Sequence, residues 1–187
     1  KYIDPSAVRE LKQYTRMEQF YRFAWGIGSV FFKIVPRPFH GVRCSILRLF
    51  GAEIGDRCTI ARSAIIFYPW KIRIGDDCAI GDWAVVYNLG KVTLGDRVTI
   101  SHRAHLCAGT HEFSRIDSPL LKLPIVIEDE SWICADAFVG PNVIVGAGAI
   151  LGAASVSVKD VPSGMILAGN PAVVIKRRPL PVREAQL

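Results

Sequence analysis

An aliphatic residue returns every six positions through the middle of this chain, and no other feature constrains the fold as strongly. A period of six fits neither an amphipathic helix, whose period is near 3.6, nor an alternating strand, whose period is two. It fits a parallel β-helix built from hexapeptides, in which each hexad forms one short strand and one corner. The aliphatic positions are Ile54, Ile60, Ile66, Ile72, Ile74, Ile80, Val86, Val92, Leu94, Ile100 and Leu106, followed after an interruption by Ile127, Ile133, Val139, Val145 and Leu151.

A longer repeat sets the number of sides of this coil. The phrase Ile/Leu-Gly-Asp begins at Ile54, at Ile74 and at Leu94, a spacing of 20 residues. Three hexads plus a two-residue excursion fill that repeat, so each turn should have three flat sides with the aliphatic side chains pointing inward. We expect the Gly-Asp pair to supply backbone freedom and hydrogen bonds at a corner. Small residues at the fifth hexad position should line the corners: Ala64, Cys78, Ala84, Ala104, Ala137, Ala149 and Ser155.

The net charge of +6 is concentrated at the two ends of the chain. Residues 1–50 contain nine Lys and Arg against three Asp and Glu, residues 51–170 ten against thirteen, and residues 171–187 four against one. A continuous basic face with interleaved aromatics is missing from this pattern, so nucleic acid is not an expected partner. The five cysteines form no CxxC pair and their number is odd, which favours a reducing compartment and a cytoplasmic protein.

The 187 residues divide into three segments. We expect a helical and aromatic cap at 1–50, the β-helix at 51–162 and a basic C-terminal tail at 163–187. Solenoid ends need covers, because an exposed coil edge invites the addition of another strand. The first segment should cover one end, and Val161-Pro162 should stop the hexads at the other.

The N-terminal segment allows two compatible interpretations. A helix is expected over residues 6–24, with Ser6 as its candidate N-cap, and the chain from Phe20 to Phe39 is rich in aromatics and flanked by basic residues. In the first interpretation, the segment covers the open first coil and contacts a neighbouring subunit. In the second, residues 16–48 rest on the inner, anionic face of a membrane. The apolar run from Phe23 to Phe32 is too short to span a bilayer.

The hexads are interrupted once. After Leu106 the next aliphatic position should fall near residue 112, yet the pattern resumes only at Ile127. Residues 112–126 must therefore leave the coil as a protruding loop. A long excursion from so regular a body is more often functional than not.

Several motifs around this loop are specific. They are Arg48-Leu49-Phe50-Gly51-Ala52-Glu53-Ile54-Gly55, Leu106-Cys107-Ala108-Gly109-Thr110-His111, Trp132-Ile133, Gly152-Ala153-Ala154-Ser155-Val156, Lys159-Asp160-Val161-Pro162 and Ala168-Gly169-Asn170-Pro171-Ala172. Over about residues 40–178 the chain resembles the hexapeptide-repeat O-acetyltransferases, in particular the colanic acid biosynthesis acetyltransferase group. The resemblance implies an all-β, left-handed parallel β-helix that assembles as a homotrimer. It also implies transfer of acetyl from acetyl-CoA, as co-substrate, to a hydroxyl of a saccharide such as a surface polysaccharide or its precursor.

Acyl transfer to a sugar requires a base, because a sugar hydroxyl is a poor nucleophile at neutral pH. An imidazole can take the proton of that hydroxyl as it attacks the thioester. His111 matches the catalytic histidine of the resembled family. The sequence therefore assigns His111 as the candidate general base.

The binding residues follow from the resemblance and from their chemistry. By resemblance, Trp132 walls the cleft, Ala135 and Ala153 offer backbone groups to the pantetheine arm, and Lys159 and Lys176 fit the nucleotide phosphates. For the saccharide acceptor, the candidates at outward positions of the coil are Trp83, Tyr87 and Asn88. The acceptor-binding residues of the galactoside branch are not clearly reproduced here.

Two functions from other classes stay open at this stage. His102 and His105 invite comparison with the γ-class carbonic anhydrases, which bind metal on the same coil, but the ligand spacing of that family is not matched and no metal is expected. A non-catalytic coil that binds glycan is the other alternative. Release of CoA thiol from acetyl-CoA separates all three.

Overall fold

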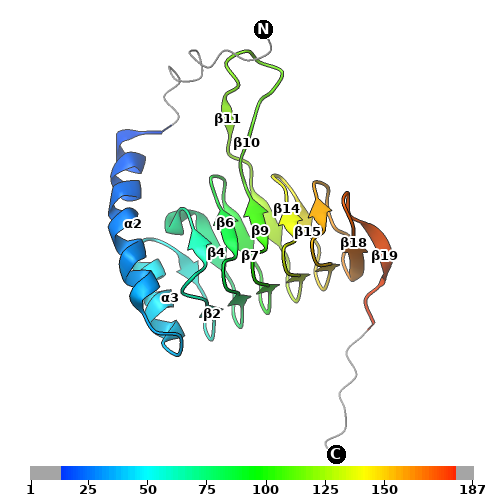
Figure 1. The fold of residues 1–187 in the computed structure, drawn as a ribbon, viewed down its shortest axis with the longest axis horizontal. Coiled ribbons are helices and arrows are strands. Elements are labelled where there is room, and N and C mark those ends of the chain that lie inside the picture. The colour runs from blue at the N-terminus through cyan, green and yellow to red at the C-terminus, as the bar shows by residue number, and fades with distance from the viewer. Residues whose placement is uncertain (1–13, 180–187) are drawn as a thin grey trace, which may run out of the picture.

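The computed structural model describes residues 14–179 as a coil of short parallel strands with two helices across one end (Figure 1). The strands of the coil form three sheets, and each complete turn contributes one strand to each sheet. Sheet A contains β1 (Glu53–Ile54), β4 (Ile72–Ile74), β7 (Val92–Leu94), β12 (Ile125–Ile127) and β15 (Ile144–Val145). Sheet B contains β2 (Thr59–Ile60), β5 (Ala79–Ile80), β8 (Thr99–Ile100), β13 (Trp132–Ile133), β16 (Ile150–Leu151), β18 (Met165–Ala168) and β19 (Val173–Arg177). Sheet C contains β3 (Ile65–Ile66), β6 (Val85–Tyr87), β9 (His105–Cys107), β14 (Phe138–Val139) and β17 (Val156–Ser157).

The register of the sheets follows the six-residue period. In sheet A, Ile54 pairs with Ile74 and Ile74 with Leu94, and in sheet B, Ile60 pairs with Ile80. The predicted aliphatic positions line the interior, where all but the half-buried Ile54 are buried. The prediction of a three-sided coil with an aliphatic core is therefore confirmed.

The glycine of the Gly-Asp phrase does not supply the expected backbone freedom, because it does not adopt a left-handed conformation. The carboxylate oxygens of Asp76 and Asp96 each accept the backbone N–H of the aspartate one coil earlier, Asp56 and Asp76, at 2.7 and 2.8 Å. A Cβ on Gly75 would collide with the carboxylate of Asp96 and with the backbone of Gly95. Glycine is needed there because it leaves room for the next carboxylate, while the left-handed backbone falls two residues later, at Asp77 with φ of 56°.

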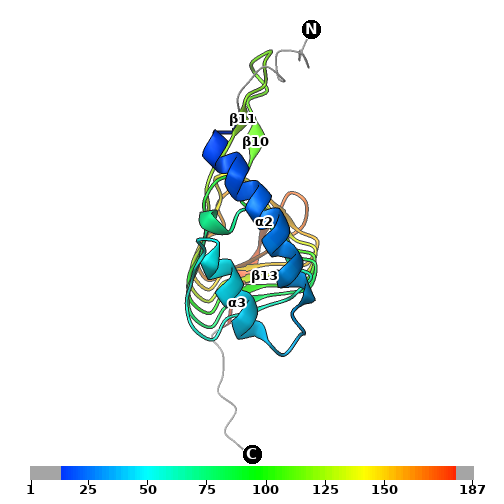
Figure 2. The same cartoon turned by 90° about the vertical axis from the view of Figure 1, so that its left-hand side faces the viewer.

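Two helices cover the first coil, as Figure 2 shows in a view from that end. Helix α2 (Arg16–Ile34) starts from a Thr15 capping box, and α3 (His40–Leu49) follows it. The inner face of α2 buries Trp25, Gly28 and Phe32, and Trp25 Nε1 donates to the Ile66 carbonyl at 2.8 Å.

The helix expected over residues 6–24 is confirmed for its last part, from Arg16. Its first part and Ser6 lie outside the described residues, and its predicted end at Ala24 is wrong. The helix continues to Ile34 because Trp25 and Phe32 pack against the first coil.

The interruption forms a hairpin that projects from the coil (Figure 1). Strands β10 (Thr110–His111) and β11 (Leu120–Leu121) pair antiparallel, and the coil resumes with β12. At the far end the coil runs past residue 162, where the sequence placed its end. There β18 still pairs in parallel with β16, and β19 folds back antiparallel along β18. The coil extends because Leu167 stacks on Leu151 and is buried.

Candidate functional site

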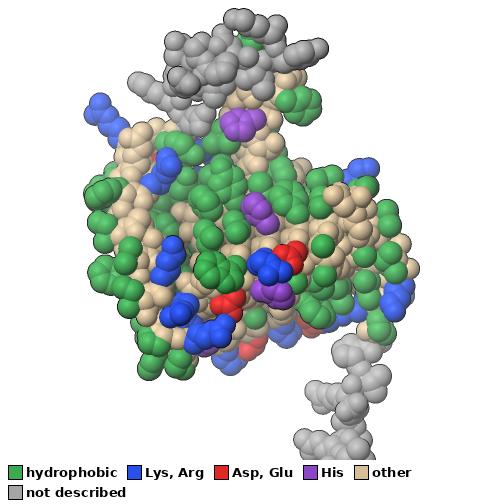
Figure 3. Space-filling model, viewed as in Figure 1, with side chains coloured by type: hydrophobic (Ala, Val, Ile, Leu, Met, Phe, Trp, Pro, Cys, Tyr) green, Lys and Arg blue, Asp and Glu red, His purple; other side chains and the backbone are tan. Residues whose placement is uncertain are grey.

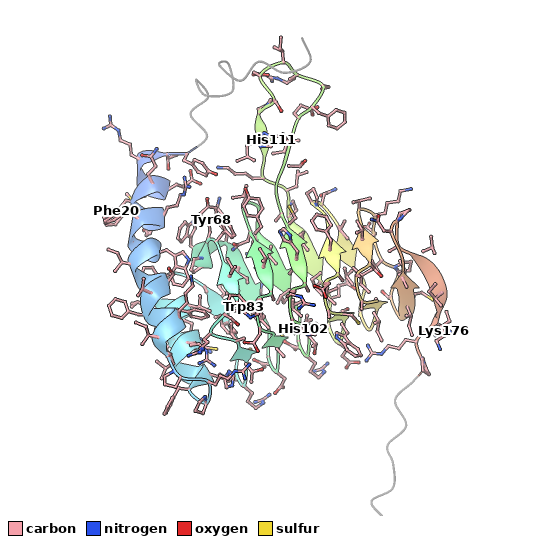
Figure 4. The ribbon with its side chains drawn as sticks, viewed as in Figure 1. Phe20, Tyr68, Trp83, His102, His111 and Lys176 are labelled. Carbon is pink, nitrogen blue, oxygen red and sulfur yellow. The ribbon has the colours of Figure 1, made fainter. Side chains whose placement is uncertain are left out.

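His111 lies on the hairpin, outside the body of the coil (Figure 4). Its side chain is exposed, and its Nδ1 lies 2.8 Å from the backbone carbonyl oxygen of Ser118. A carbonyl oxygen can only accept, so Nδ1 carries the proton in this contact. In the neutral form of the ring the lone pair is then on the other nitrogen, Nε2, so the contact defines which nitrogen could act as a base.

The backbone of the hairpin tip fixes the carbonyl that orients His111. Ser118 is buried in a left-handed conformation with φ of 39°. Its N–H donates to the Arg115 carbonyl at 3.0 Å, and the Glu112 N–H donates to the Pro119 carbonyl at 3.0 Å. These bonds close the tip into a turn, so the Ser118 carbonyl keeps its direction toward the imidazole.

The base of the hairpin is tied to the N-terminal helix. Lys122 Nζ lies 3.7 Å from Glu18 Oε1, and Lys71 Nζ of the coil lies 3.4 Å from the same oxygen. A hydrogen bond from the Thr15 backbone N–H holds the pKa of Glu18 below its usual value, and the two lysines act in the same direction. The helix, the coil and the hairpin therefore meet at one carboxylate, a link that no sequence motif indicates.

Trp132 lies on a different side of the coil from His111. It stands on the outer surface of sheet B in β13, 43% exposed, and its Nε1 donates to Ser101 Oγ at 2.8 Å. The hairpin instead leaves the coil between a strand of sheet C and a strand of sheet A. The structure does not bring these two predicted site residues together within one chain.

The residues assigned to coenzyme A are also divided between corners. Ala135 and Ala153 follow β13 and β16 at the corner between sheets B and C. Lys176 is exposed on β19 of sheet B, on the side of the coil away from His111 (Figure 4). Lys159 is exposed after β17, at the corner between sheets C and A. Within one chain, therefore, four of the predicted residues lie on sheet B or at its corner with sheet C, and Lys159 lies at a different corner. The four are Trp132, Ala135, Ala153 and Lys176.

The three acceptor candidates have different surroundings. Trp83 is 63% exposed at the corner between sheets B and C, with φ of 61°, and Tyr87 is half-buried on sheet C. The outward position predicted for Asn88 is wrong. Its side chain is fully buried, with Nδ2 donating to the Tyr68 carbonyl at 2.6 Å and Oδ1 accepting from the Tyr68 N–H at 3.0 Å. These two bonds to the Tyr68 backbone link neighbouring coils, and they satisfy both polar groups of the buried amide.

The remaining histidines of the coil do not form a cluster. His102 is exposed at a corner, and His105 is half-buried on sheet C, where burial lowers its pKa. Between residues 14 and 179 the structure contains no group of three histidine, cysteine or acidic side chains that could hold a metal ion.

A groove that the sequence did not predict runs over sheet B. Its volume is about 560 Å³, and one wall is the loop between the two helices. Arg43, fully buried, shapes this wall by donating to the carbonyls of Pro36 and Arg37 at 2.7 and 2.9 Å. Ser101, the hydrogen-bond partner of Trp132, lies at its edge. The lining residues are Arg37, Pro38, His40, Thr59, Ala61, Ala79, Ile80, Gly81, Asp82, Thr99, Ile100 and Ser101.

Comparisons with known proteins agree on one family. A family model described as the hexapeptide repeat of succinyl-transferase matches residues 71–101. WcaF of Escherichia coli K12, which its name assigns provisionally as a colanic acid biosynthesis acetyltransferase, is 38% identical over 154 residues, covering 82% of this chain and 85% of that protein.

Solved structures share the fold. The hexapeptide-repeat acetyltransferase VCA0836 of Vibrio cholerae superposes with a TM-score of 0.81 at 23% identity, over 87% of this chain and 93% of that one. Galactoside acetyltransferase in complex with coenzyme A superposes with a TM-score of 0.80 at 24% identity, over 92% and 89% of the two chains. The fold is the left-handed parallel β-helix of these enzymes, as predicted.

Proposed function

The chain belongs to the hexapeptide-repeat acetyltransferases, and we propose that it transfers acetyl from acetyl-CoA to a hydroxyl of a saccharide, with His111 as general base. Family membership favours acetyl transfer over the carbonic-anhydrase-like and scaffold alternatives. The names of WcaF and of galactoside acetyltransferase support a saccharide acceptor. The contact between His111 Nδ1 and the Ser118 carbonyl supports the role of the histidine most directly, because it leaves Nε2 able to accept a proton.

The reaction needs two proton transfers at one nitrogen. Nε2 of His111 takes the proton of the sugar hydroxyl while the hydroxyl oxygen attacks the carbonyl carbon of the thioester. A new C–O bond forms, the C–S bond breaks, and the imidazolium returns the proton to the departing thiolate. The products are the acetyl ester and CoA thiol. The Ser118 carbonyl stabilises the transient imidazolium because its hydrogen bond to Nδ1 strengthens when the ring becomes charged.

The two substrates need different surfaces. In this proposal Trp132 walls the thioester end of acetyl-CoA, the small residues Ala135 and Ala153 admit the pantetheine arm, and the exposed lysines 159 and 176 pair with phosphates. The groove over sheet B, which has the polar side chains Asp82 and Ser101 in its lining, has a volume that suits a sugar ring. Trp83 adjoins Asp82 and stays an acceptor candidate, whereas Asn88 does not.

The distribution of these residues calls for a second subunit. His111 and Trp132 lie on different sides of one coil, so a cleft that contains both must lie between two copies of the chain. A cyclic trimer, in which each hairpin reaches the sheet B side of its neighbour, provides three such clefts. We include this homotrimer in the proposal.

The central experiment measures thiol release from acetyl-CoA with a panel of mono- and oligosaccharides. For the best acceptor, His111→Ala should lower turnover by about two to four orders of magnitude, which is the usual contribution of a general base. Binding of acetyl-CoA, measured by calorimetry, should stay nearly unchanged. The matched control is His102→Ala, since His102 is an exposed histidine on the coil body. Equal turnover of the His111→Ala variant and the native protein would remove His111 from the mechanism.

A mixing experiment tests the shared cleft. Trp132→Ala should also lower turnover, through weaker binding of acetyl-CoA. When His111→Ala and Trp132→Ala subunits are refolded together, about a quarter of the clefts in random trimers should contain both native residues, so activity should return. Activity that stays at the level of the separate variants would place both residues in the cleft of a single chain.

A further inference from the structure

Helix α2 is apolar on two opposite faces. The inner face packs on the first coil through Trp25 and Phe32. On the outer face, large apolar residues recur at spacings of three and four, so they form one stripe along the helix. The members of this stripe are Phe20 (64% exposed), Phe23 (70%), Ile27 (53%), Val30 (53%), Phe31 (61%) and Ile34 (67%).

The shorter helix extends this apolar surface. The two helices lie side by side across the end of the coil (Figure 2), and α3 with the residue before it exposes Phe39, Val42 and Leu49. We call the exposed surface of residues 16–49 the end face. Figure 3 shows its edge, where green side chains gather along α2 with blue ones beside them. Contiguous apolar surface of this kind marks an interaction site.

The charge on the end face indicates the chemistry of the partner. Exposed cations lie beside the apolar stripe, with Arg16 and Lys33 on α2. Arg22 and Arg48 are also exposed, but their guanidinium groups contact the Tyr68 ring and the carbonyls of Ile54 and Gly55. The acid of α2, Glu18, is half-buried and ion-paired with lysines of the coil and the hairpin, so it does not offset them. A second copy of the end face would set like charges against one another, whereas an anionic surface matches both the cations and the apolar stripe.

We propose that the end face docks on an anionic phospholipid bilayer, with α2 lying in the plane of the interface. The apolar stripe then enters the boundary between headgroups and acyl chains, and the cations remain at the headgroups. No helix within residues 14–179 has the length and apolarity needed to cross a membrane, so the contact is peripheral.

This docking sets the height of the proposed site above the bilayer. The hairpin that carries His111 leaves the coil after β9, two turns beyond the first strand of sheet C. Two strand spacings amount to about 10 Å, and the helices between the first coil and the bilayer add roughly 10 Å more. A saccharide attached to a lipid is the acceptor that suits this arrangement. The inference about the acceptor rests on the proposed function, whereas the docking does not.

The test is sedimentation of the full chain with vesicles. Vesicles of phosphatidylcholine alone should leave it in the supernatant, and an equimolar mixture with phosphatidylglycerol should sediment it. Phe20→Ser/Phe31→Ser should reduce the partition coefficient about tenfold or more, because each phenylalanine buries apolar surface. Lys33→Gln should reduce it about fivefold, the effect of roughly 1 kcal/mol for one cation at such a surface, and added salt should weaken the remaining binding.

Matched controls lie elsewhere on the coil. Val173→Ser/Ile175→Ser removes two exposed apolar side chains at the opposite end, and Arg73→Gln removes one exposed cation from sheet A. Both should bind vesicles like the native protein. Circular dichroism of every variant establishes that it is folded, and thiol release with a soluble acceptor should be unchanged in the end-face variants.

Two outcomes would overturn the proposal. One is equal sedimentation of native and Phe20→Ser/Phe31→Ser proteins, which assigns the binding to another surface. The other is absence of vesicle binding together with a larger mass in light scattering that the same substitutions abolish, which assigns the end face to a second copy. Neither outcome changes the result expected for His111→Ala, so the two proposals fail independently.

Discussion

The coil body and the hairpin formed by β10 and β11 hold their residues in different ways. In the body, each strand residue has a counterpart one coil away, and each inward side chain stacks on an equivalent one. In the hairpin, a single pair of short strands and a few backbone bonds hold an exposed imidazole. The body therefore supplies stability by repetition, and the hairpin can carry chemistry because it is released from that repetition.

The sharpest test of this difference compares two truncated aliphatic side chains. Ile133 is fully buried in the coil, and Leu121 is half-buried in the hairpin. Ile133→Ala should lower the free energy of unfolding by about 2–5 kcal/mol through lost burial and a cavity. Leu121→Ala should cost roughly 1 kcal/mol or less. Urea denaturation followed by circular dichroism measures both, and equal costs would mean that the hairpin belongs to the same cooperative unit as the coil.

Adding a methyl group in the body should also be costly. Gly75→Ala places a Cβ against the Asp96 carboxylate and the Gly95 backbone, and we expect a loss of about 1–3 kcal/mol from overpacking. In α2, the Cβ of Gly26→Ala meets nothing within 4 Å, so the same change should stabilise the protein by about 0.5–1 kcal/mol. Thermal unfolding should show shifts of opposite sign, and a stable Gly75→Ala protein would mean that the aspartate ladder is adaptable.

The pH dependence of stability should come partly from His105 in the body. Burial lowers the pKa of this imidazole in the folded protein, so the unfolded chain takes up a proton first as the pH falls. The contribution of neutral His105 to the free energy of unfolding is complete above the ordinary histidine pKa of about 6.5, and it is lost progressively as the pH falls below that value. His105→Leu should flatten the decline in urea midpoint between neutral and mildly acidic pH. An unchanged slope in the His105 variant would assign the decline to other groups.

The smallest effect is expected at the exposed ion pairs of the corners. Arg103 binds both carboxylate oxygens of Asp136 at 2.7 Å, and this contact holds the pKa of Asp136 below its usual value. Both side chains are exposed, so water and salt screen the pair. Arg103→Gln should leave the unfolding midpoint at neutral pH nearly unchanged. A large loss would show that the corner ladders contribute to the cooperativity of the coil.

The regular part of the molecule could be predicted far better than the site. The 20-residue spacing of Ile54, Ile74 and Leu94 predicts three sheets, because the same repeat sets the register of successive coils. The left-handed course of the coil was implied by family resemblance alone. Asn88 was misplaced because it follows Tyr87 where the strand of sheet C ends, and only the Tyr68 backbone shows that its amide is buried.

The sequence by itself determined the coil and the protruding loop, since both are encoded in the spacing of nearby residues, whereas the candidate imidazole was implied by the family resemblance. The tertiary structure decided which ring nitrogen of His111 contacts the backbone, which side of the coil holds Trp132, and where Arg43 shapes a groove. It also revealed that α2 keeps a second apolar face exposed. These features depend on contacts between segments that lie far apart in the chain or in different coils, and a local period carries no information about them.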